Sequence, residues 1–345
     1  MVRPKFPMSE ASMEIGSTLV VQYIINNCMS TKTFFKLFPP PKFLNIPYAG
    51  IDISDDAVRC IEYSEGVKGL KLHRYGSRNL NPGIIESGNI IKEKELIDII
   101  SSLAKELNID TVKASLPEER MYLFKTEVPT VSEDQIRHNI EFKLEENVPL
   151  SPSDAIFFFD LIPKTNSVDI KTEHSTYASV SVAPRDLVNS YLNVLRSSGL
   201  GVVSFEIQPK AIARAVVPVG SSDNHMIVHI MNNKTGIYIV CGGVVCFTST
   251  ISLGSSSDIS LFQNEIIKVY SYWLEYGVGG VINKIILSGK EALRIGGDSR
   301  ISPDPRIPVE IAEIWQNAFS NNHYIPPITF EDSLQYVVAA GLALP

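Results

Sequence analysis

The sequence has few cysteines, and none of them is spaced for a metal site or a redox pair. The four are Cys28, Cys60, Cys241 and Cys246, and no two of them form a C-x-x-C motif. Two lie in apolar runs that predict strands, where cysteine behaves as a small hydrophobic residue. We therefore expect reduced, buried thiols, as in a cytosolic protein.

A run of lysine and arginine is also missing. The chain carries 31 basic and 38 acidic residues, which gives a net charge of −7. Domains that bind nucleic acid through its phosphates present a basic patch or stripe. The charge pattern therefore argues against a nucleic-acid partner.

Long apolar runs are absent. The longest near the start, Leu19 to Ile25, is far below the roughly 20 residues that a transmembrane helix needs. No small-residue cleavage site follows it, so a signal peptide is not expected. The first 28 residues show no helix or strand period, and Met29 opens a more ordinary start. We expect residues 1–33 to be a disordered leader or a mis-called start.

The following arm leaves two interpretations open. Phe34 to Pro47 combines four phenylalanines, a Pro39-Pro40-Pro41 run and two lysines. It is expected to lie as an ordered arm on the domain surface or to touch a membrane peripherally.

The motifs of common hydrolytic enzymes do not occur. The chain has no G-x-S-x-G, no H-E-x-x-H and no P-loop, so nucleophilic, zinc-dependent and P-loop chemistry are not indicated. Adjacent acids point in different directions on a helix or strand, which predicts solvated faces rather than catalytic pairs. These adjacent acids are Asp55/Asp56, Glu118/Glu119 and Glu145/Glu146.

Two strand meanders organise the chain. The first comprises Ala49 to Ile53, Val58 to Tyr63 and Leu70 to Tyr75, and the second Met226 to Met231, Thr235 to Cys241 and Val244 to Ser252. Each is a series of period-2 or apolar runs separated by short turns. The repeated layout predicts an α/β protein made of duplicated sheet domains with a cleft between them.

The helical pattern completes the predicted organisation. Ser132-Glu133-Asp134-Gln135 is a capping box at the start of one helix. The other expected helices are Lys92 to Leu107, one opening at Pro184, Asp258 to Tyr276, Pro308 to Phe319 and Glu331 to Leu342. We expect a first subdomain over residues 34–116 and 331–345, a small α+β insert over 117–185, and a second half over 186–330.

The sequence resembles a known family along most of its length. The matching stretches are Ala49-Gly50-Ile51-Asp52-Ile53-Ser54 with Val58-Arg59 and Ile61-Glu62, then Asn81 to Ile85, Gly88 to Ile91, Leu116-Pro117, Ile136 to Pro149, Val182 to Val188, Ser288-Gly289 and Ala340 to Ala343. In order and spacing they are similar to the type IV pilus assembly protein PilM family. This family belongs to the actin-like ATPase superfamily and is related to the cell-division protein FtsA.

The resemblance implies a fold, a place and a partner. It implies an actin-like, ribonuclease H-like fold and a cytoplasmic protein at the inner face of the cytoplasmic membrane, peripheral to it through its partners. The implied role is that of a scaffold of the pilus assembly platform. The implied partner is a PilN-like inner-membrane protein, whose short cytoplasmic N-terminal peptide would bind between the core and the insert. The resemblance also implies ATP with Mg²⁺ in the interdomain cleft, with little turnover.

The first phosphate turn departs from the family pattern. A tight turn that starts with a carboxylate can direct backbone N–H groups at phosphate, and here it begins at Asp52. Ser54 replaces the expected glycine, Asp55 and Asp56 replace small hydroxyl residues, and Arg59 stands near the expected lysine. The serine obstructs close approach, and each added carboxylate costs on the order of 1 kcal/mol beside phosphate in a solvated cleft.

The other two nucleotide motifs depart as well. The second turn reads His229-Ile230-Met231, without the aspartate and glycine of the family. The third keeps Ser288 and Gly289, but Lys290 and Glu291 follow, and Gly296-Gly297 is a partial remnant. We expect binding of ATP and Mg²⁺ to be weakened or lost and ATPase activity to be absent. His229 is expected to be a hydrogen-bonded strand residue rather than a metal ligand.

The partner groove is expected beside the insert. Phe142, Val148, Pro149 and Leu150 are its predicted apolar lining, with simple packing of the insert as the alternative for each. Two other functions were weighed against the scaffold. An actin-like protein that cycles nucleotide requires intact phosphate turns. A membrane tether like FtsA requires a basic amphipathic C-terminal helix, for which Leu344-Pro345 leaves no room.

Overall fold

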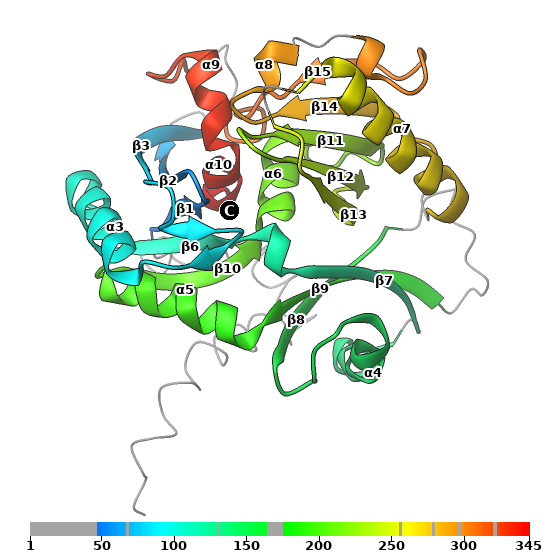
Figure 1. Ribbon diagram of the computed structural model, residues 1–345, viewed down its shortest axis with the longest axis horizontal. Helices are drawn as coiled ribbons and strands as arrows, with labels where there is room; N and C mark the ends of the chain where they lie inside the picture. The colour runs from blue at the N-terminus through cyan, green and yellow to red at the C-terminus, as the bar shows by residue number, and fades with distance from the viewer. Residues whose placement is uncertain are drawn as a thin grey trace, which may run out of the picture. The chain divides into compact units, whose positions relative to one another are not determined.

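Two five-stranded sheets with the same strand order form the centre of the protein (Figure 1). The first has the order β10-β6-β1-β2-β3 and the second β13-β12-β11-β14-β15. In each, an antiparallel three-strand meander is extended from its first strand by two parallel strands. The predicted duplication is therefore confirmed at the level of strand order and direction.

The strand bounds agree with the two predicted meanders. In the first sheet they are β1 (Ala49–Ile53), β2 (Ala57–Gly66), β3 (Gly69–Asn79), β6 (Thr111–Leu116) and β10 (Gly201–Ile207). In the second they are β11 (Asn224–Ile230), β12 (Thr235–Cys241), β13 (Val244–Ile251), β14 (Lys284–Ser288) and β15 (Val309–Ile311). β11 and β12 are buried along their whole length, as expected of central strands covered on both faces.

This computed structural model describes residues 47–66, 69–129, 131–163, 175–254, 257–277, 280–295, 299–319 and 323–345. Tyr48–Pro345 form a unit separate from Met1–Pro47. The predictions for the leader and for the arm up to residue 46 lie outside the described residues. Among the helices that are described, none is long and apolar enough to cross a membrane.

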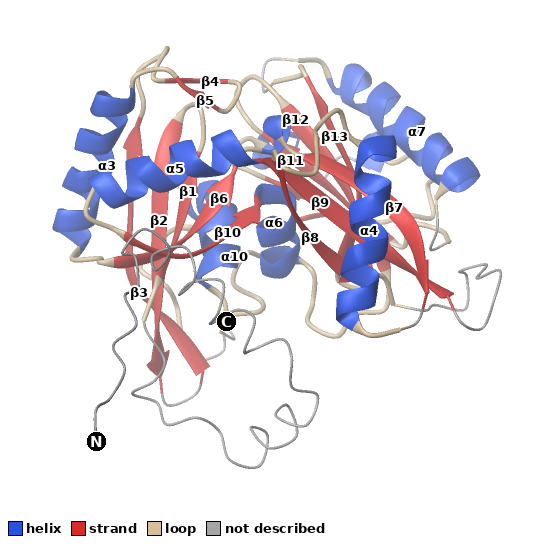
Figure 2. Cartoon of the chain, turned by 90° about the horizontal axis from the view of Figure 1, so that it is seen from below, coloured by secondary structure: helices blue, strands red, loops and turns tan. Residues whose placement is uncertain are grey.

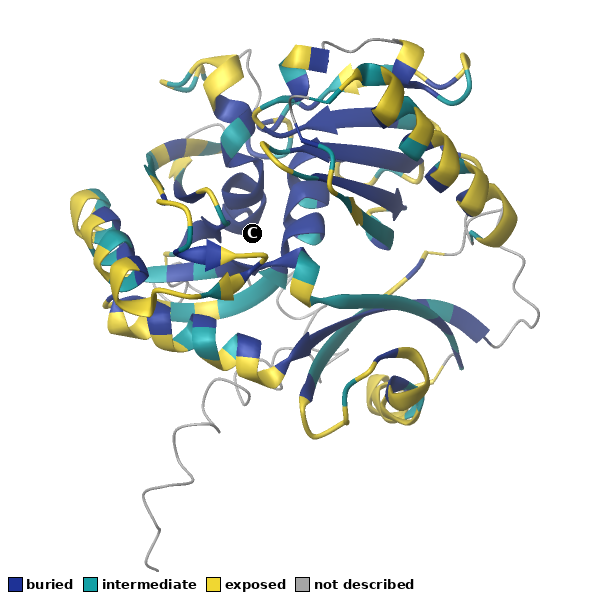
Figure 3. Ribbon diagram, viewed as in Figure 1, coloured by how far each residue is buried: buried dark blue, intermediate teal, exposed yellow. Residues whose placement is uncertain are grey.

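Helices pack on both sheets through the faces that their periodicity predicts. α3 (Glu93–Leu107) and α5 (Arg185–Ser197) contribute to the core of the first sheet, and α7 (Ile259–Tyr276) to the core of the second. On α5 the buried residues are Leu187, Tyr191, Val194 and Leu195. The outer faces of these three helices are largely exposed, whereas the central α6 (Gln208–Val216) and α10 (Val337–Ala343) are almost wholly buried (Figure 3).

The insert has its own sheet, helix and core. β7 (Tyr122–Pro129), β8 (Ala155–Leu161) and β9 (Ser175–Pro184) form an antiparallel sheet with the order β7-β9-β8. α4 (Glu133–Asn147) lies across it (Figure 2) and buries Ile136, Ile140 and Leu144. The 3₁₀ turn η3 (Glu118–Arg120) connects β6 to the insert.

The predicted start of the second half at residue 186 was wrong. α5 packs with the core of the first sheet, and β10 pairs in parallel with β6. These residues therefore belong to the first half. The sequence analysis predicted neither β10 nor α6. β10 is a half-exposed edge strand, and its apolar residues show no clear period.

The helix predicted from Pro308 to Phe319 was also wrong. Val309–Ile311 form the edge strand β15, which pairs with β14 through Ile285, Ile286 and Leu287. The rest of that stretch forms turns. A proline before an apolar run resembles a helix start, but hydrogen bonds to the open edge of β14 decide the conformation.

Short elements account for the remaining regular structure. The predicted last helix is realised as α9 (Phe330–Ser333), the 3₁₀ turn η5 (Leu334–Tyr336) and α10. The others are β4 (Ile85–Glu86), β5 (Asn89–Ile90), α8 (Ala292–Ile295) and η4 (Ser299–Ile301).

Close backbone packing of α10 generates the first prediction. A Cβ on Gly50 would lie 2.6 Å from the Ala343 amide nitrogen and 2.8 Å from Leu342 Cβ. We expect Gly50→Ala to lower the free energy of unfolding by about 2–3 kcal/mol, because neither β1 nor α10 can yield. Gly201→Ala is the control, since its nearest atom would be 3.5 Å away. Equal urea midpoints for the two variants would contradict this packing argument.

Candidate functional site

Equivalent positions of the two sheets carry a polar pair each. On β1, Asp52 Oδ1 accepts a hydrogen bond of 2.9 Å from Ser115 Oγ at the end of β6. On β11, His229 Nδ1 lies 2.8 Å from Ser288 Oγ at the end of β14. His229 and Ser288 are register partners, and Asp52 and Ser115 follow the register pair Ile51/Ala114. Because the fold is duplicated, the Asp52/Ser115 and His229/Ser288 pairs lie at corresponding strand ends of the two sheets.

Asp52 is buried and held in place by three neighbours. Gln208 Nε2, at the start of α6, donates to Oδ1 at 3.0 Å, and Arg59 Nη1 lies 3.7 Å from Oδ2. Burial raises the pKa of Asp52, against the opposing effect of Arg59 and of the hydrogen bonds from Gln208 and Ser115. Both hydrogen bonds are accepted by Oδ1, and Oδ2 faces Arg59.

Arg59 on β2 is the cation of the first turn. Its guanidinium donates to Asp56 Oδ2 at 2.9 Å and to Ser54 Oγ at 2.9 Å, and the residue is 8% exposed. Burial alone would raise the pKa of Asp56, but the charge and hydrogen bond of Arg59 lower it below its usual value. Ser54 Oγ also contacts the other side of the turn, 2.7 Å from Asp56 Oδ1 and 2.9 Å from the Ala57 carbonyl oxygen.

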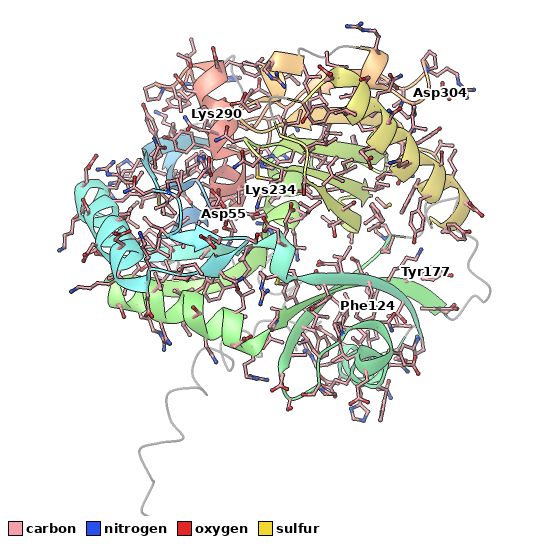
Figure 4. All side chains as sticks on the ribbon, in the orientation of Figure 1. Asp55, Phe124, Tyr177, Lys234, Lys290 and Asp304 are labelled. Carbon is pink, nitrogen blue, oxygen red and sulfur yellow. The ribbon has the colours of Figure 1, made fainter. Side chains whose placement is uncertain are left out.

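Asp55 does not face the turn, contrary to the sequence-based expectation. Its carboxylate accepts the backbone N–H of Gly88 at 3.0 Å and of Ser87 at 3.1 Å. These residues form the tight β4–β5 turn, where both have positive φ. Asp55 therefore stabilises the β4–β5 turn, whereas Asp56 pairs with Arg59. The two carboxylates that were expected together beside phosphate thus make separate contacts. Figure 4 labels Asp55 in the first half and Lys234 and Lys290 in the second.

The second turn meets the first. The Met231 N–H donates to the Lys234 carbonyl at 3.0 Å, which closes the hairpin. Asn232 in this turn places its Nδ2 3.5 Å from Asp56 Oδ2 in the first turn. The two hairpin turns thus approach to within side-chain hydrogen-bonding distance.

His229 is the hydrogen-bonded strand residue that the sequence predicts. Burial, and next the nearby positive charge of Arg59, lower the pKa of its ring to about 4. The residue is 7% exposed. The described residues contain no group of His, Cys, Asp and Glu suited to a metal ion.

Gly289 has a packing role at the end of β14. Its φ is +92°, and a Cβ there would overlap the Ile230 carbonyl oxygen and lie 3.1 Å from His229 Nδ1. Only glycine fits both requirements. Ser288 is completely buried, whereas Lys290 is exposed. The predicted Gly296-Gly297 remnant lies outside the described residues.

A second contact between the halves was missed by the sequence analysis. Glu118 on η3 accepts hydrogen bonds from Tyr238 on β12 and, at 2.9 Å, from Thr250 on β13. Burial raises the pKa of both Glu118 and Tyr238. Glu119 forms an ion pair with Lys234. The prediction that this acid pair is a solvated face was therefore wrong, because η3 lies against the second sheet.

The predicted groove residues do not form one lining. Val148 is 5% exposed and belongs to the insert core, and Leu150 packs partly against that core. Phe142 is 75% exposed and Pro149 is also exposed. Packing of the insert, the alternative given above, therefore describes Val148 and Leu150.

The buried histidine generates the second prediction. Unfolded chains protonate histidine near pH 6.5, whereas folded His229 stays neutral down to about pH 4. The unfolded state thus binds more protons between these values, and stability falls as the pH drops through this window, by on the order of 3 kcal/mol. We expect His229→Asn, which retains a hydrogen-bond donor, to lack this component. Urea unfolding of the wild-type protein and the variant from pH 7 to pH 4 measures this pH-dependent loss of stability. Parallel curves of unfolding free energy against pH would refute the assignment to His229.

Comparison with known proteins places this arrangement in a family. A family model described as type IV pilus assembly protein PilM matches residues 50–277. No curated protein sequence matches the chain. Among solved structures, a PilM-PilN type IV pilus biogenesis complex is similar, with a TM-score of 0.72, 16% identity, and coverage of 86% of this chain and 98% of that chain.

Two further solved structures are more distant. One is the ethanolamine utilization protein EutJ from Carboxydothermus hydrogenoformans, with a TM-score of 0.47, 12% identity, and coverage of 89% of this chain and 90% of that chain. The other is the cytoplasmic domain of EpsL from the type II secretion system of Vibrio cholerae, with a TM-score of 0.46, 10% identity, and coverage of 86% of this chain and 94% of that chain. With the duplicated strand order, the likeness to the PilM structure confirms the expected actin-like α/β fold. Because the family match spans well over half of its residues, the chain belongs to the type IV pilus assembly protein PilM family.

Proposed function

We propose that this protein is a scaffold of the type IV pilus assembly platform that works without nucleotide turnover. Its partner would be a PilN-like inner-membrane protein, bound through a short cytoplasmic peptide at the inner face of the cytoplasmic membrane. Family membership and the fold likeness to a PilM chain in a PilM-PilN complex support the role and the partner. The single observation that carries the scaffold part is that Arg59, the buried cation of the first turn, is paired with Asp56 and Ser54 of the protein itself.

The residues of the cleft do not suit ATP with Mg²⁺. A phosphate site requires uncommitted cations or N–H groups, but Arg59 is held by Asp56 and Ser54, and Lys234 by Glu119. The contact between Asn232 and Asp56 also bridges the two turns between which phosphates would have to lie. This arrangement supports a weakened or lost nucleotide site.

The same residues offer no catalytic machinery for ATP hydrolysis. His229, which replaces the aspartate of the family pattern, is neutral and engaged with Ser288. Asp52 accepts two hydrogen bonds and lies beside Arg59. A general base for water must reach its proton with an available acceptor; Asp52 Oδ1 and His229 Nδ1 are already hydrogen-bonded, and Asp52 Oδ2 faces the Arg59 guanidinium at 3.7 Å.

The third prediction tests nucleotide binding. We expect titration of the full chain with a fluorescent ATP analogue to give no saturable binding in the micromolar range, with or without Mg²⁺. The expectation follows from the internal neutralisation of Arg59 and Lys234. A nucleotide-binding actin-like protein serves as the positive control. Micromolar affinity that depends on Mg²⁺ would refute the nucleotide-independent part of the proposal and leave the partner part standing.

The free edge of β8 is the strongest candidate for peptide capture. β8 pairs with β9 on one side and is the last strand of the insert sheet as described. Its side chains alternate, so that Phe157 and Phe159 pack on the insert core, while Lys210 of α6 lies 5.8 Å above the Phe158 ring and pairs with Asp160. An extended peptide can add to such an edge and place alternate side chains on either face.

The fourth prediction tests whether the peptide binds at the β8 edge or at Phe142, which the sequence analysis predicted to line the groove. A fluorescent peptide with the N-terminal sequence of the host's PilN-like protein is titrated against the full chain. Because a ring that anchors a partner contributes about 1–3 kcal/mol, we expect Phe158→Ala to weaken binding roughly 10- to 100-fold. Phe142→Ala is the matched control on the far side of the insert and should leave the affinity unchanged. The reverse pattern would transfer the peptide site to α4.

A further inference from the structure

The outer face of α4 carries a surface feature that the proposed function does not use. Asp134, Gln135, His138, Asn139 and Phe142 line a shallow depression of about 340 Å³. They lie on the side of the helix opposite the residues that it buries against the sheet. We call these five residues the outer face of α4.

Phe142 is the apolar centre of this face. Its side chain is 75% exposed, and its ring contact is an edge-on approach to His138 at 5.0 Å between centroids. A large ring left in water at the rim of a depression is typical of an anchor for a partner's side chain. Gln135 and Asn139 supply amide groups beside it.

The charge around the depression is strongly negative. Five acids of α4 are exposed, namely Glu133, Asp134, Glu141, Glu145 and Glu146. The two basic residues of the helix are turned elsewhere: Arg137 lies 5.1 Å above the Phe157 ring, and Lys143 donates to Thr126 Oγ1 at 2.9 Å and to the Glu127 carbonyl at 2.7 Å. The outer face of α4 therefore has no lysine or arginine beside these carboxylates, and its one basic group is the His138 ring, whose Nδ1 lies 3.3 Å from Glu141 Oε2.

This charge selects the kind of partner. Anionic headgroups and nucleic acid would be repelled, because both are negatively charged. A second copy of the same face would bring like charges together. The partner that complements this acidic face and its exposed ring is a positively charged protein segment with an apolar side. Since i, i+4 ridges run along the face from Asp134 through His138 to Phe142, a helix can pack on it by ridges into grooves.

We propose that the outer face of α4 docks a basic amphipathic helix of a partner protein. One apolar side chain of that helix enters the depression beside Phe142 and His138. Lysine or arginine residues flanking it pair with Asp134, Glu141 and Glu145. This surface lies on the other side of α4 from the β8 sheet, so the proposal does not depend on the peptide site described above.

The fifth prediction tests this docking with a defined probe. Two synthetic amphipathic helices of equal length, each with a leucine face, carry either lysine or glutamate at their polar positions. Fluorescence anisotropy with the full chain is expected to show binding of the lysine helix alone, weakened about tenfold or more by Phe142→Ser and by the double variant Glu141→Lys/Glu145→Lys. The loss of exposed residues should leave the thermal midpoint unchanged, which is checked first.

Matched controls lie on α7. Leu274 and Glu275 are exposed there, so Leu274→Ser and Glu275→Lys remove the same chemistry at an unrelated place and should retain full affinity. Equal losses in both sets, or equal binding of both peptides, would overturn the proposal. So would binding to anionic vesicles or self-association in sedimentation that Phe142→Ser abolishes, because these outcomes assign the face to a membrane or to a second copy.

Discussion

The burial of the Arg59 guanidinium is the constraint on which the cleft depends. A buried cation is tolerated only with carboxylates and hydrogen-bond acceptors around it. Asp56 and Ser54 supply these within the turn, and Asp52 lies close by on β1. The buried cation of the first turn is thus compensated by carboxylates of the protein itself. The conformation of Ser54 and Asp56 follows from this one residue.

In the second half, the positive charge of Arg59 acts on a histidine instead of a carboxylate. At the position equivalent to Asp52 this half carries His229, whose pKa falls to about 4 through burial and the proximity of Arg59. A neutral ring beside a buried cation avoids repulsion, whereas a protonated ring would add to it. The duplicated backbone therefore supports unlike chemistry at equivalent positions, with a charged network in one half and a neutral pair in the other.

Direct polar contacts join the two halves. Tyr238 and Thr250 reach Glu118, Lys234 reaches Glu119, and Asn232 approaches Asp56. Buried and satisfied polar networks of this kind favour one arrangement over alternatives. The close approach of α10 to β1 and α6 adds contacts that no larger side chain at Gly50 or Gly341 would permit. A scaffold benefits from such fixed geometry, which is consistent with the proposed function.

The sequence predicts what depends on local periodicity and misses what depends on distant partners. Strands β1 to β3 and β11 to β13 and the buried face of α5 follow from patterns within a few residues. β15 follows from the open edge of β14, and β10 from that of β6. In the site, the resemblance identifies Asp52, His229 and Gly289. The direction of Asp55 is set by N–H groups at Ser87 and Gly88, which no pattern around the turn reveals.

The insert shows where binding chemistry is concentrated in this protein. Its small core is formed by α4, the three strands and the segment that joins α4 to β8. It carries a strand edge flanked by phenylalanines and, on the opposite side of α4, an acidic face with an exposed ring. A strand edge selects an extended chain through main-chain hydrogen bonds, whereas a charged helix face selects a helix of opposite charge. Under the two proposals made above, one subdomain would bind partners of different conformation on separate surfaces, as a scaffold requires.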